Sequence, residues 1–130
     1  QVQWGVEHKL RILAADDNQK VLALLQKDFA RFGLEVVTCA RRGELRALLE
    51  AEPFDALAID ESLTGGSGVE FCMSIKGKYP ALTRIIMTSA PTREIVEARS
   101  HRMIDGYIVK PVSAATLLNE IRACRRKNKS

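Results

Sequence analysis

The stretch Ala56-Leu57-Ala58-Ile59-Asp60 is a run of four apolar residues that ends in an acid. A half-exposed strand alternates apolar and polar residues, whereas a run that is apolar throughout is typical of a parallel strand covered on both faces. Further short runs rich in apolar residues lie at 10–15, 36–39, 85–87 and 107–109. The sequence therefore predicts five strands, most of them buried.

Between these runs, apolar residues recur at steps of three and four, which is typical of helices with one buried face. The stripes consist of Val21, Leu22, Leu25, Phe29 and Phe32; of Leu45, Leu48 and Leu49; of Val69, Phe71, Cys72 and Ile75; of Ile95, Val96 and Met103; and of Leu117, Leu118, Ile121 and Cys124. The fourth stripe is the weakest, and Ser113 is a suitable N-cap for the last helix. Strands that alternate with helices predict a parallel sheet with helices on both sides.

The length of 130 residues fits one domain. We expect a leader at 1–8, the domain at 9–126 and a basic tail or linker start at 127–130. Five of the positive charges lie in residues 122–130, and without them the net charge of +4 becomes −1. The basic tail is therefore interpreted as a solvated helix end, and direct nucleic-acid binding by this domain is not expected.

Neither a bilayer-spanning run nor a signal-peptide core is found, so a cytoplasmic protein without membrane contact is expected. The three cysteines, Cys39, Cys72 and Cys124, match no metal-ligand spacing, and their odd number argues against a disulfide framework. They are interpreted as small buried hydrophobes.

The residues that follow the strands are the candidates for a site, because parallel α/β sheets bind ligands at the carboxyl ends of their strands. They are Asp16 and Asp17, Asp60, Thr88, and Lys110. Taken singly, each has a structural explanation: acids favour helix starts, and a hydroxyl can satisfy a loop amide.

Together they are harder to explain by structure alone. Two carboxylates 4 Å apart repel by about 4 kcal/mol at an effective dielectric constant near 20. A divalent cation would remove this penalty, and hard oxygen ligands favour Mg²⁺. A lysine and a hydroxyl beside the metal would supply donors for a phosphoryl group.

Four short motifs then resemble the receiver domains of response regulators in two-component signalling. They are Leu13-Ala14-Ala15-Asp16-Asp17-Asn18; Asp55-Ala56-Leu57-Ala58-Ile59-Asp60 with Gly68 eight residues on; Ile85-Ile86-Met87-Thr88-Ser89-Ala90; and Tyr107-Ile108-Val109-Lys110-Pro111. Asp60 and Thr88 are 28 residues apart and Thr88 and Lys110 are 22 apart, and the resemblance runs from about Leu10 to Arg125. It implies a flavodoxin-like doubly wound five-stranded parallel sheet, order 2-1-3-4-5, with five helices in three α/β/α layers.

The resemblance also implies roles for individual residues. Asp60 would accept a phosphoryl group from the phosphohistidine of a sensor histidine kinase or phosphotransfer protein. Asp17, Asp60 and the backbone carbonyl of Ser62 would bind Mg²⁺ directly, and Asp16 would do so through water. Lys110 would pair with Asp60 and contact the phosphoryl oxygens. Thr88 would turn its hydroxyl toward the phosphoryl group and Tyr107 would move inward with it, as the two switch residues.

For output, the resemblance implies a partner face on the fourth helix, fifth strand and fifth helix, which could also form a homodimer. A weakly packed fourth helix would shift at small cost. Arginines at 93, 99, 102 and 122 would suit an acidic partner or simply solvate this face. In a longer chain, a C-terminal output domain could follow the basic tail.

The sequence departs from the family pattern in the loop after Asp60. Thr64 stands where a proline is usual, and Gly65 and Gly66 follow, so a mobile loop is expected. Small residues at Ser62 and Ala90 leave room for an attacking water, which predicts a phosphoryl group of moderate lifetime. The implied protein is thus an acceptor with slow autodephosphorylation rather than a turnover enzyme.

Other classes fit less well. A haloacid-dehalogenase-like phosphatase needs two acids at i and i+2, whereas Asp16 and Asp17 are adjacent and Asp60 precedes Glu61 and Ser62. A dinucleotide-binding fold would need a Gly-x-Gly-x-x-Gly after the first strand. A receiver-like docking or dimerisation module that works without phosphorylation remains the main alternative.

Overall fold

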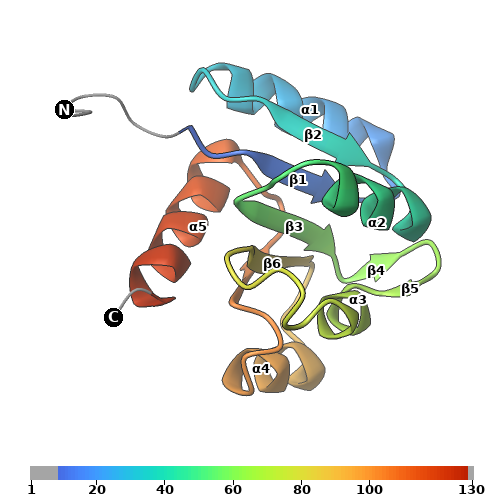
Figure 1. Ribbon diagram of the computed structural model, residues 1–130. Coiled ribbons are helices and arrows are strands. Elements are labelled where there is room, and N and C mark those ends of the chain that lie inside the picture. Colours follow the sequence, from blue (N-terminus) through green and yellow to red (C-terminus); the bar gives the residue numbers. More distant parts are fainter. Residues whose placement is uncertain (1–8, 129–130) are drawn as a thin grey trace, which may run out of the picture.

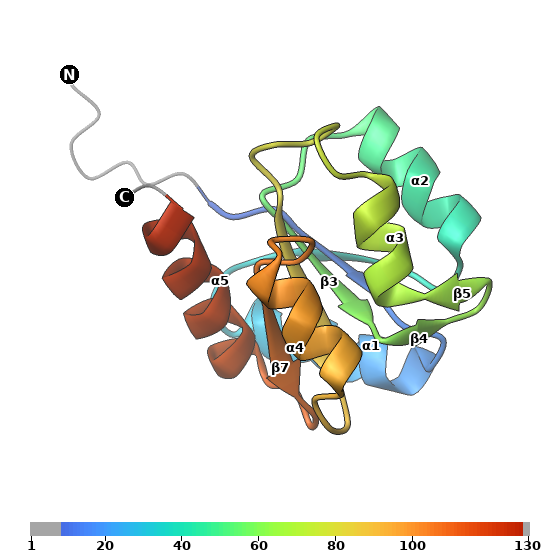
Figure 2. The ribbon, with the colours of Figure 1, turned by 90° about the horizontal axis from the view of Figure 1, so that it is seen from below.

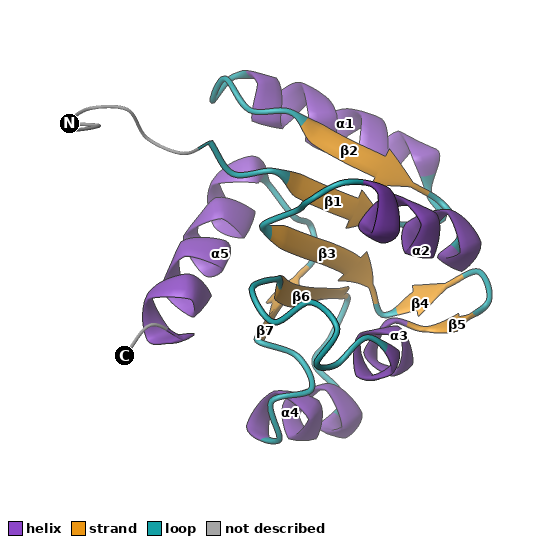
Figure 3. Cartoon of the chain, viewed as in Figure 1, coloured by secondary structure: helices purple, strands orange, loops and turns teal. Residues whose placement is uncertain are grey.

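One parallel sheet forms the centre of the molecule, whose computed structural model describes residues 9–128. Its strands are β1 (Ile12–Ala15), β2 (Val36–Cys39), β3 (Ala56–Asp60), β6 (Thr83–Thr88) and β7 (Gly106–Val109). They pair in the order β2-β1-β3-β6-β7. Figure 1 labels β2, β1, β3 and β6, and Figure 3 also labels β7. Since β6 and β7 are the fourth and fifth strands of this sheet, the predicted order 2-1-3-4-5 is confirmed.

In the described residues 9–128, five helices cover the two faces of the sheet, as expected (Figure 3). They are α1 (Gln19–Ala30), α2 (Arg42–Ala51), α3 (Gly68–Ser74), α4 (Arg93–Ser100) and α5 (Ala114–Asn128). Buried residues of α1 and α5 pack on one face, and those of α2, α3 and α4 pack on the other. The result is the three-layer flavodoxin-like arrangement.

The core consists of two apolar clusters because successive strand residues point to opposite faces. In β1, Ile12 belongs to the cluster under α1 and α5, whereas Leu13 belongs to the cluster under α2, α3 and α4. Phe29 and Phe71 are fully buried, one in each cluster. Burying a side chain of this kind contributes about 1.5–3 kcal/mol, so the two clusters fix the strand ends relative to one another.

Side chains cap the starts of α1 and α5, and the predicted N-cap Ser113 is confirmed. The side chain of Asn18 accepts hydrogen bonds from the backbone N–H groups of Lys20 and Val21 at the start of α1. The Ser113 hydroxyl accepts one from Thr116 N–H at the start of α5. Phe32 does not belong to the buried stripe of α1: the helix ends at Ala30, and the Phe32 side chain is 52% exposed.

The segment after β3 forms a short antiparallel hairpin, where the sequence predicted a mobile loop. Its strands are β4 (Ser62–Leu63) and β5 (Gly66–Ser67), joined through Gly65 at φ +107°. Arg42 from α2 donates a hydrogen bond of 2.7 Å to the Gly65 carbonyl. Glycine supplies the positive φ of the turn, so the residues that predicted mobility form a defined turn.

Helix α4 is short and is held mainly by Ile95 and Ala98, which are buried. The predicted stripe was wrong in two positions, because Val96 is 44% exposed and Met103 lies beyond the end of the helix. Figure 2 shows α4 beside α3 and next to β7. With two buried side chains in eight residues, α4 has only a small anchored face.

At the C-terminus, α5 continues to Asn128, so Lys127 and Asn128 belong to the helix rather than to a separate tail. The predicted leader at 1–8 and the last two residues of the predicted tail lie outside the described residues. Within 9–128, no helix is both long and apolar enough to cross a membrane. All three cysteines are buried free thiols, as predicted.

Candidate functional site

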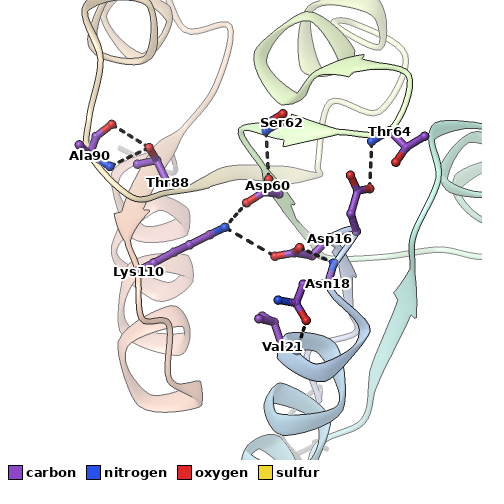
Figure 4. A network of polar contacts seen from close by, with 10 residues as sticks. Asp16, Asn18, Val21, Asp60, Ser62, Thr64, Thr88, Ala90 and Lys110 are labelled. Atoms are coloured by element: carbon purple, nitrogen blue, oxygen red, sulfur yellow. Dashed lines mark hydrogen bonds and ion pairs between the residues drawn. The ribbon is translucent and has the colours of Figure 1, made fainter.

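Two of the predicted acids meet at the carboxyl end of the sheet (Figure 4). Asp16 directly follows β1, and Asp60 is the last residue of the neighbouring strand β3. They are 3% and 7% exposed, which is unusual for acids because burial removes a charged group from water. Both therefore need a counter-charge in the site.

Lys110 supplies this counter-charge from the loop after β7. Its ammonium group forms an ion pair with Asp60 Oδ1 and lies 3.8 Å from Asp16 Oδ2. Burial by itself lowers the pKa of Lys110, but the hydrogen bond and charge of Asp60 outweigh it, so the pKa is raised. The lysine therefore stays charged and joins β7 to the two acidic strand ends.

Asp16 is only partly compensated. Its Oδ1 accepts a hydrogen bond of 2.9 Å from Asn18 N–H, whereas its buried Oδ2 has no hydrogen-bond donor among the described residues. Burial raises the pKa of Asp16, and the nearby Asp60 charge raises it further, although the Asn18 bond and Lys110 oppose this. The site thus has spare affinity for a cation.

Asp60 is positioned by the hairpin and by α3. Its Oδ2 accepts a hydrogen bond of 3.1 Å from the Ser62 N–H group. Gly68, the first residue of α3, lies so close to the Asp60 carbonyl that a Cβ atom there would be 2.4 Å from the oxygen. Gly68 N–H also donates to the Glu61 carbonyl at 3.0 Å. A side chain at position 68 would therefore displace Asp60 or the start of α3.

Asp17 is exposed and is turned toward the hairpin rather than toward Lys110. Its Oδ1 accepts a hydrogen bond of 2.9 Å from Thr64 N–H. In residues 9–128 the structure accordingly contains no group of three or more metal-binding side chains already assembled. The sequence missed the Thr64 contact, since a backbone amide leaves no signal in residue type.

Thr88, the last residue of β6, is fully buried and its hydroxyl points toward its own loop. It donates to the Ala90 carbonyl at 2.7 Å and accepts from Ala90 N–H at 3.1 Å. Tyr107 in β7 is half-buried, and the guanidinium of Arg99 lies 5.6 Å from its ring centre. The structure therefore does not bring Thr88 or Tyr107 into contact with Asp60.

The chemical type of these ligand atoms, carboxylate oxygens, fits a hard divalent cation. Carboxylates of Asp16 and Asp60 converge, an exposed third carboxylate lies one residue away at Asp17, and Lys110 already neutralises part of the charge. Carboxylate oxygen ligands suit Mg²⁺ better than sulfur-seeking metals. To complete such a site, Asp17 would have to leave the Thr64 amide.

Sequence comparison assigns this combination of fold and site to a class. Residues 12–122 match the model of the response regulator receiver domain. The chain therefore belongs to the receiver-domain family of two-component response regulators, whose members are signalling switches rather than classical turnover enzymes.

Particular relatives agree with this assignment. The chain is 31% identical over 122 residues to the phosphate regulon transcriptional regulatory protein PhoB of Rhizobium meliloti, covering 92% of this chain and 53% of that protein. It is 26% identical over 119 residues to the alkaline phosphatase synthesis transcriptional regulatory protein PhoP of Bacillus subtilis, covering 91% and 49%. The chain thus spans about half the length of these relatives.

A solved structure gives the same result for the fold. The CheY-like receiver domain protein of Methanospirillum hungatei JF-1 superimposes with a TM-score of 0.82 at 27% identity, covering 94% of this chain and 98% of that one. The predicted family and fold are therefore both confirmed.

Proposed function

We propose that the chain is a phosphoacceptor switch in which Asp60 takes a phosphoryl group from a histidine kinase or phosphotransfer protein. The observation that carries this is the pairing of buried Asp60 with Lys110, beside an Asp16 oxygen that has no hydrogen-bond donor in residues 9–128. A fold gains little from two buried acids and one lysine unless the cluster binds something.

The chemical step is a transfer to a carboxylate oxygen. A new bond forms between an Asp60 oxygen and phosphorus, the nitrogen–phosphorus bond of the donor phosphohistidine breaks, and the electron pair leaves with the imidazole. Lys110 moves from the Asp60 carboxylate to the oxygens of the bound phosphoryl group. Its positive charge therefore neutralises the carboxylate before the transfer and the phosphoryl oxygens after it.

For the metal we propose Asp17, Asp60 and the Ser62 carbonyl as direct ligands, and Asp16 as a ligand through water. Mg²⁺ held there would offset the negative charge of the acids and of the phosphoryl group. Asp17 contributes by exchanging its Thr64 hydrogen bond for the metal, which couples metal binding to the position of the hairpin.

We propose that Thr88 and Tyr107 transmit the change. The Thr88 hydroxyl can reach a phosphoryl group only by breaking its two hydrogen bonds with Ala90. Because Thr88 and Val109 are neighbours in the β6–β7 pairing, movement at Thr88 reaches β7 and, through it, Tyr107. The short helix α4 then shifts with small loss of packing.

Partners follow from this proposal. The face formed by α4, β7 and α5 would bind the output partner, an output domain in a longer chain, or a second copy of the chain. We place the domain in the cytoplasm, without membrane or direct nucleic-acid contact. Small residues at Ser62 and Ala90 support slow autodephosphorylation rather than a persistent phosphoryl group.

Intact mass spectrometry after incubation with acetyl phosphate and Mg²⁺ tests the proposal. One added phosphoryl group is expected in the wild-type chain and none in Asp60→Asn or in the presence of EDTA. Thr64→Ala, which keeps the backbone N–H and hence the Asp17 contact, should be phosphorylated like the wild type. A chain that gains no phosphoryl group would instead be a docking or dimerisation module.

A further inference from the structure

A second polar pocket lies at the opposite end of the sheet from Asp60. It has a volume of about 720 Å³ and is lined by Arg84 near the start of β6, by Arg99 and Arg102 at and just after the end of α4, and by Asp105 and Lys127. We call it the Arg84 pocket. Four basic side chains and one carboxylate give it a formal charge of +3.

Arg84 is placed for binding an anion. Its side chain is only 14% exposed, and its buried Nε has no hydrogen-bond acceptor within reach in residues 9–128. Asp105 Oδ2 is 3.6 Å from this nitrogen, beyond hydrogen-bond length. It accepts a hydrogen bond of 2.7 Å from the backbone N–H group of Arg84 instead. The other oxygen, Oδ1, accepts from Asn128. The carboxylate thus has hydrogen-bond donors of its own, so Asp105 only partly neutralises the Arg84 guanidinium, whose Nη2 donates to the Arg102 carbonyl at 3.5 Å.

Arg102 adds an independent observation. It is the one non-glycine residue among those described with a positive φ, at 61°. It is the left-handed residue that ends α4, where Met103 N–H donates to the Ala98 carbonyl at 2.8 Å, and this conformation is unfavourable for a residue with a Cβ atom. Glycine or asparagine would fit the backbone better, but arginine adds a third guanidinium to the pocket, beside those of Arg84 and Arg99.

We propose that the Arg84 pocket binds a small molecule that bears a phosphate group. Guanidinium groups match phosphate oxygens in geometry, and here they come from β6, from α4 and from the segment after α4. The volume lies in the range of small-molecule sites, which favours a compact ligand with several charges over an extended acidic protein surface. This site does not depend on phosphorylation of Asp60.

Binding at the pocket would also reach Tyr107. Arg99 lines the pocket, and its guanidinium lies over the Tyr107 ring. A ligand that draws Arg99 toward phosphate oxygens takes the cation away from the ring, so the ring signals of Tyr107 should change when the pocket fills.

The test is an NMR titration of the chain with inorganic pyrophosphate, in EDTA and at constant ionic strength. Saturable shifts are expected at the amides of Arg84, Arg102 and Asp105, and the same shifts are expected in Asp60→Asn. Arg102→Gly relieves the backbone strain, so it should keep or raise the unfolding midpoint while weakening binding about tenfold, the effect of losing one charge-assisted hydrogen bond.

Arg93→Gln is the matched control, because it removes the same charge from a side chain that is 93% exposed and outside the pocket. It should change the affinity less than about twofold, as expected for an exposed surface charge. Shifts that do not saturate, or an equal loss in Arg93→Gln and Arg102→Gly, would mean general charge screening and would overturn the proposal. Binding of a glutamate-rich peptide without any binding of pyrophosphate would also overturn it.

Discussion

Replacing Gly68 by alanine tests how Asp60 is positioned. The added Cβ would lie 2.4 Å from the Asp60 carbonyl oxygen and 3.3 Å from Ile86 Cδ1. The first neighbour is backbone in the middle of a five-stranded sheet, so it cannot move aside as a flexible side chain would. Over-packing of this kind costs about 1–3 kcal/mol, which we expect as a loss of unfolding free energy in Gly68→Ala.

Urea unfolding followed by circular dichroism measures this loss. The midpoint should fall while the slope stays constant, because the variant unfolds the same surface as the wild type. Phosphorylation by acetyl phosphate should also slow by about tenfold or more, since a displacement of the order of 1 Å at a reacting group can cost up to about a hundredfold.

Gly43→Ala is the matched control. Gly43 lies in helix α2 with an ordinary helical backbone and with nothing within 4 Å of the position that a Cβ atom would take. Alanine there should therefore stabilise the chain by about 0.5 kcal/mol. If Gly68→Ala unfolds at the wild-type urea concentration and is phosphorylated at the wild-type rate, the close approach to Asp60 is not what positions the site.

Three further predictions concern charge in the core. Lys110→Met leaves two buried carboxylates without their cation, so the chain should lose about 2 kcal/mol of unfolding free energy in EDTA. In urea melts, Mg²⁺ should restore part of this loss. An equal loss with and without Mg²⁺ would argue against a metal site beside Lys110. Asp16→Asn should raise the urea midpoint in EDTA, because burial raises the pKa of Asp16 and so disfavours its charged form in the folded state; an unchanged midpoint would contradict this. Burial raises the pKa of Cys72 from 9.0 to about 12. The unfolded chain therefore loses this proton first, and stability should fall as the pH rises from 9 toward 12; replacing Cys72 by alanine should flatten that slope, and an identical slope would refute the assignment.

The fold was predictable because its signals are local. Runs such as Ala56–Ile59 have no polar residue to face water, so only a sheet covered on both sides accommodates them. Phe32 and Met103 were misassigned because three- and four-residue spacing continues past a helix end that the backbone fixes. The hairpin after β3 was missed because glycine indicates a turn and a mobile loop equally well.

The site was predictable only in part. Residue type and position after a strand brought Asp16, Asp60 and Lys110 together correctly. The orientation of Asp17 depends on the Thr64 amide, and that of Thr88 depends on Ala90, and both are backbone contacts. The Arg84 pocket joins residues from three distant segments, so no motif in the sequence indicates it.

The position of the phosphoryl group is the most direct test of the proposed switch. Borohydride reduces an aspartyl phosphate to homoserine and leaves a free aspartate unchanged, so the modified residue can be located by peptide mass spectrometry. After phosphorylation with acetyl phosphate and Mg²⁺, homoserine is expected at position 60 alone, and its yield should fall to background in EDTA. Homoserine at position 16 or 17, or a yield at position 60 that does not depend on Mg²⁺, would contradict the proposed function.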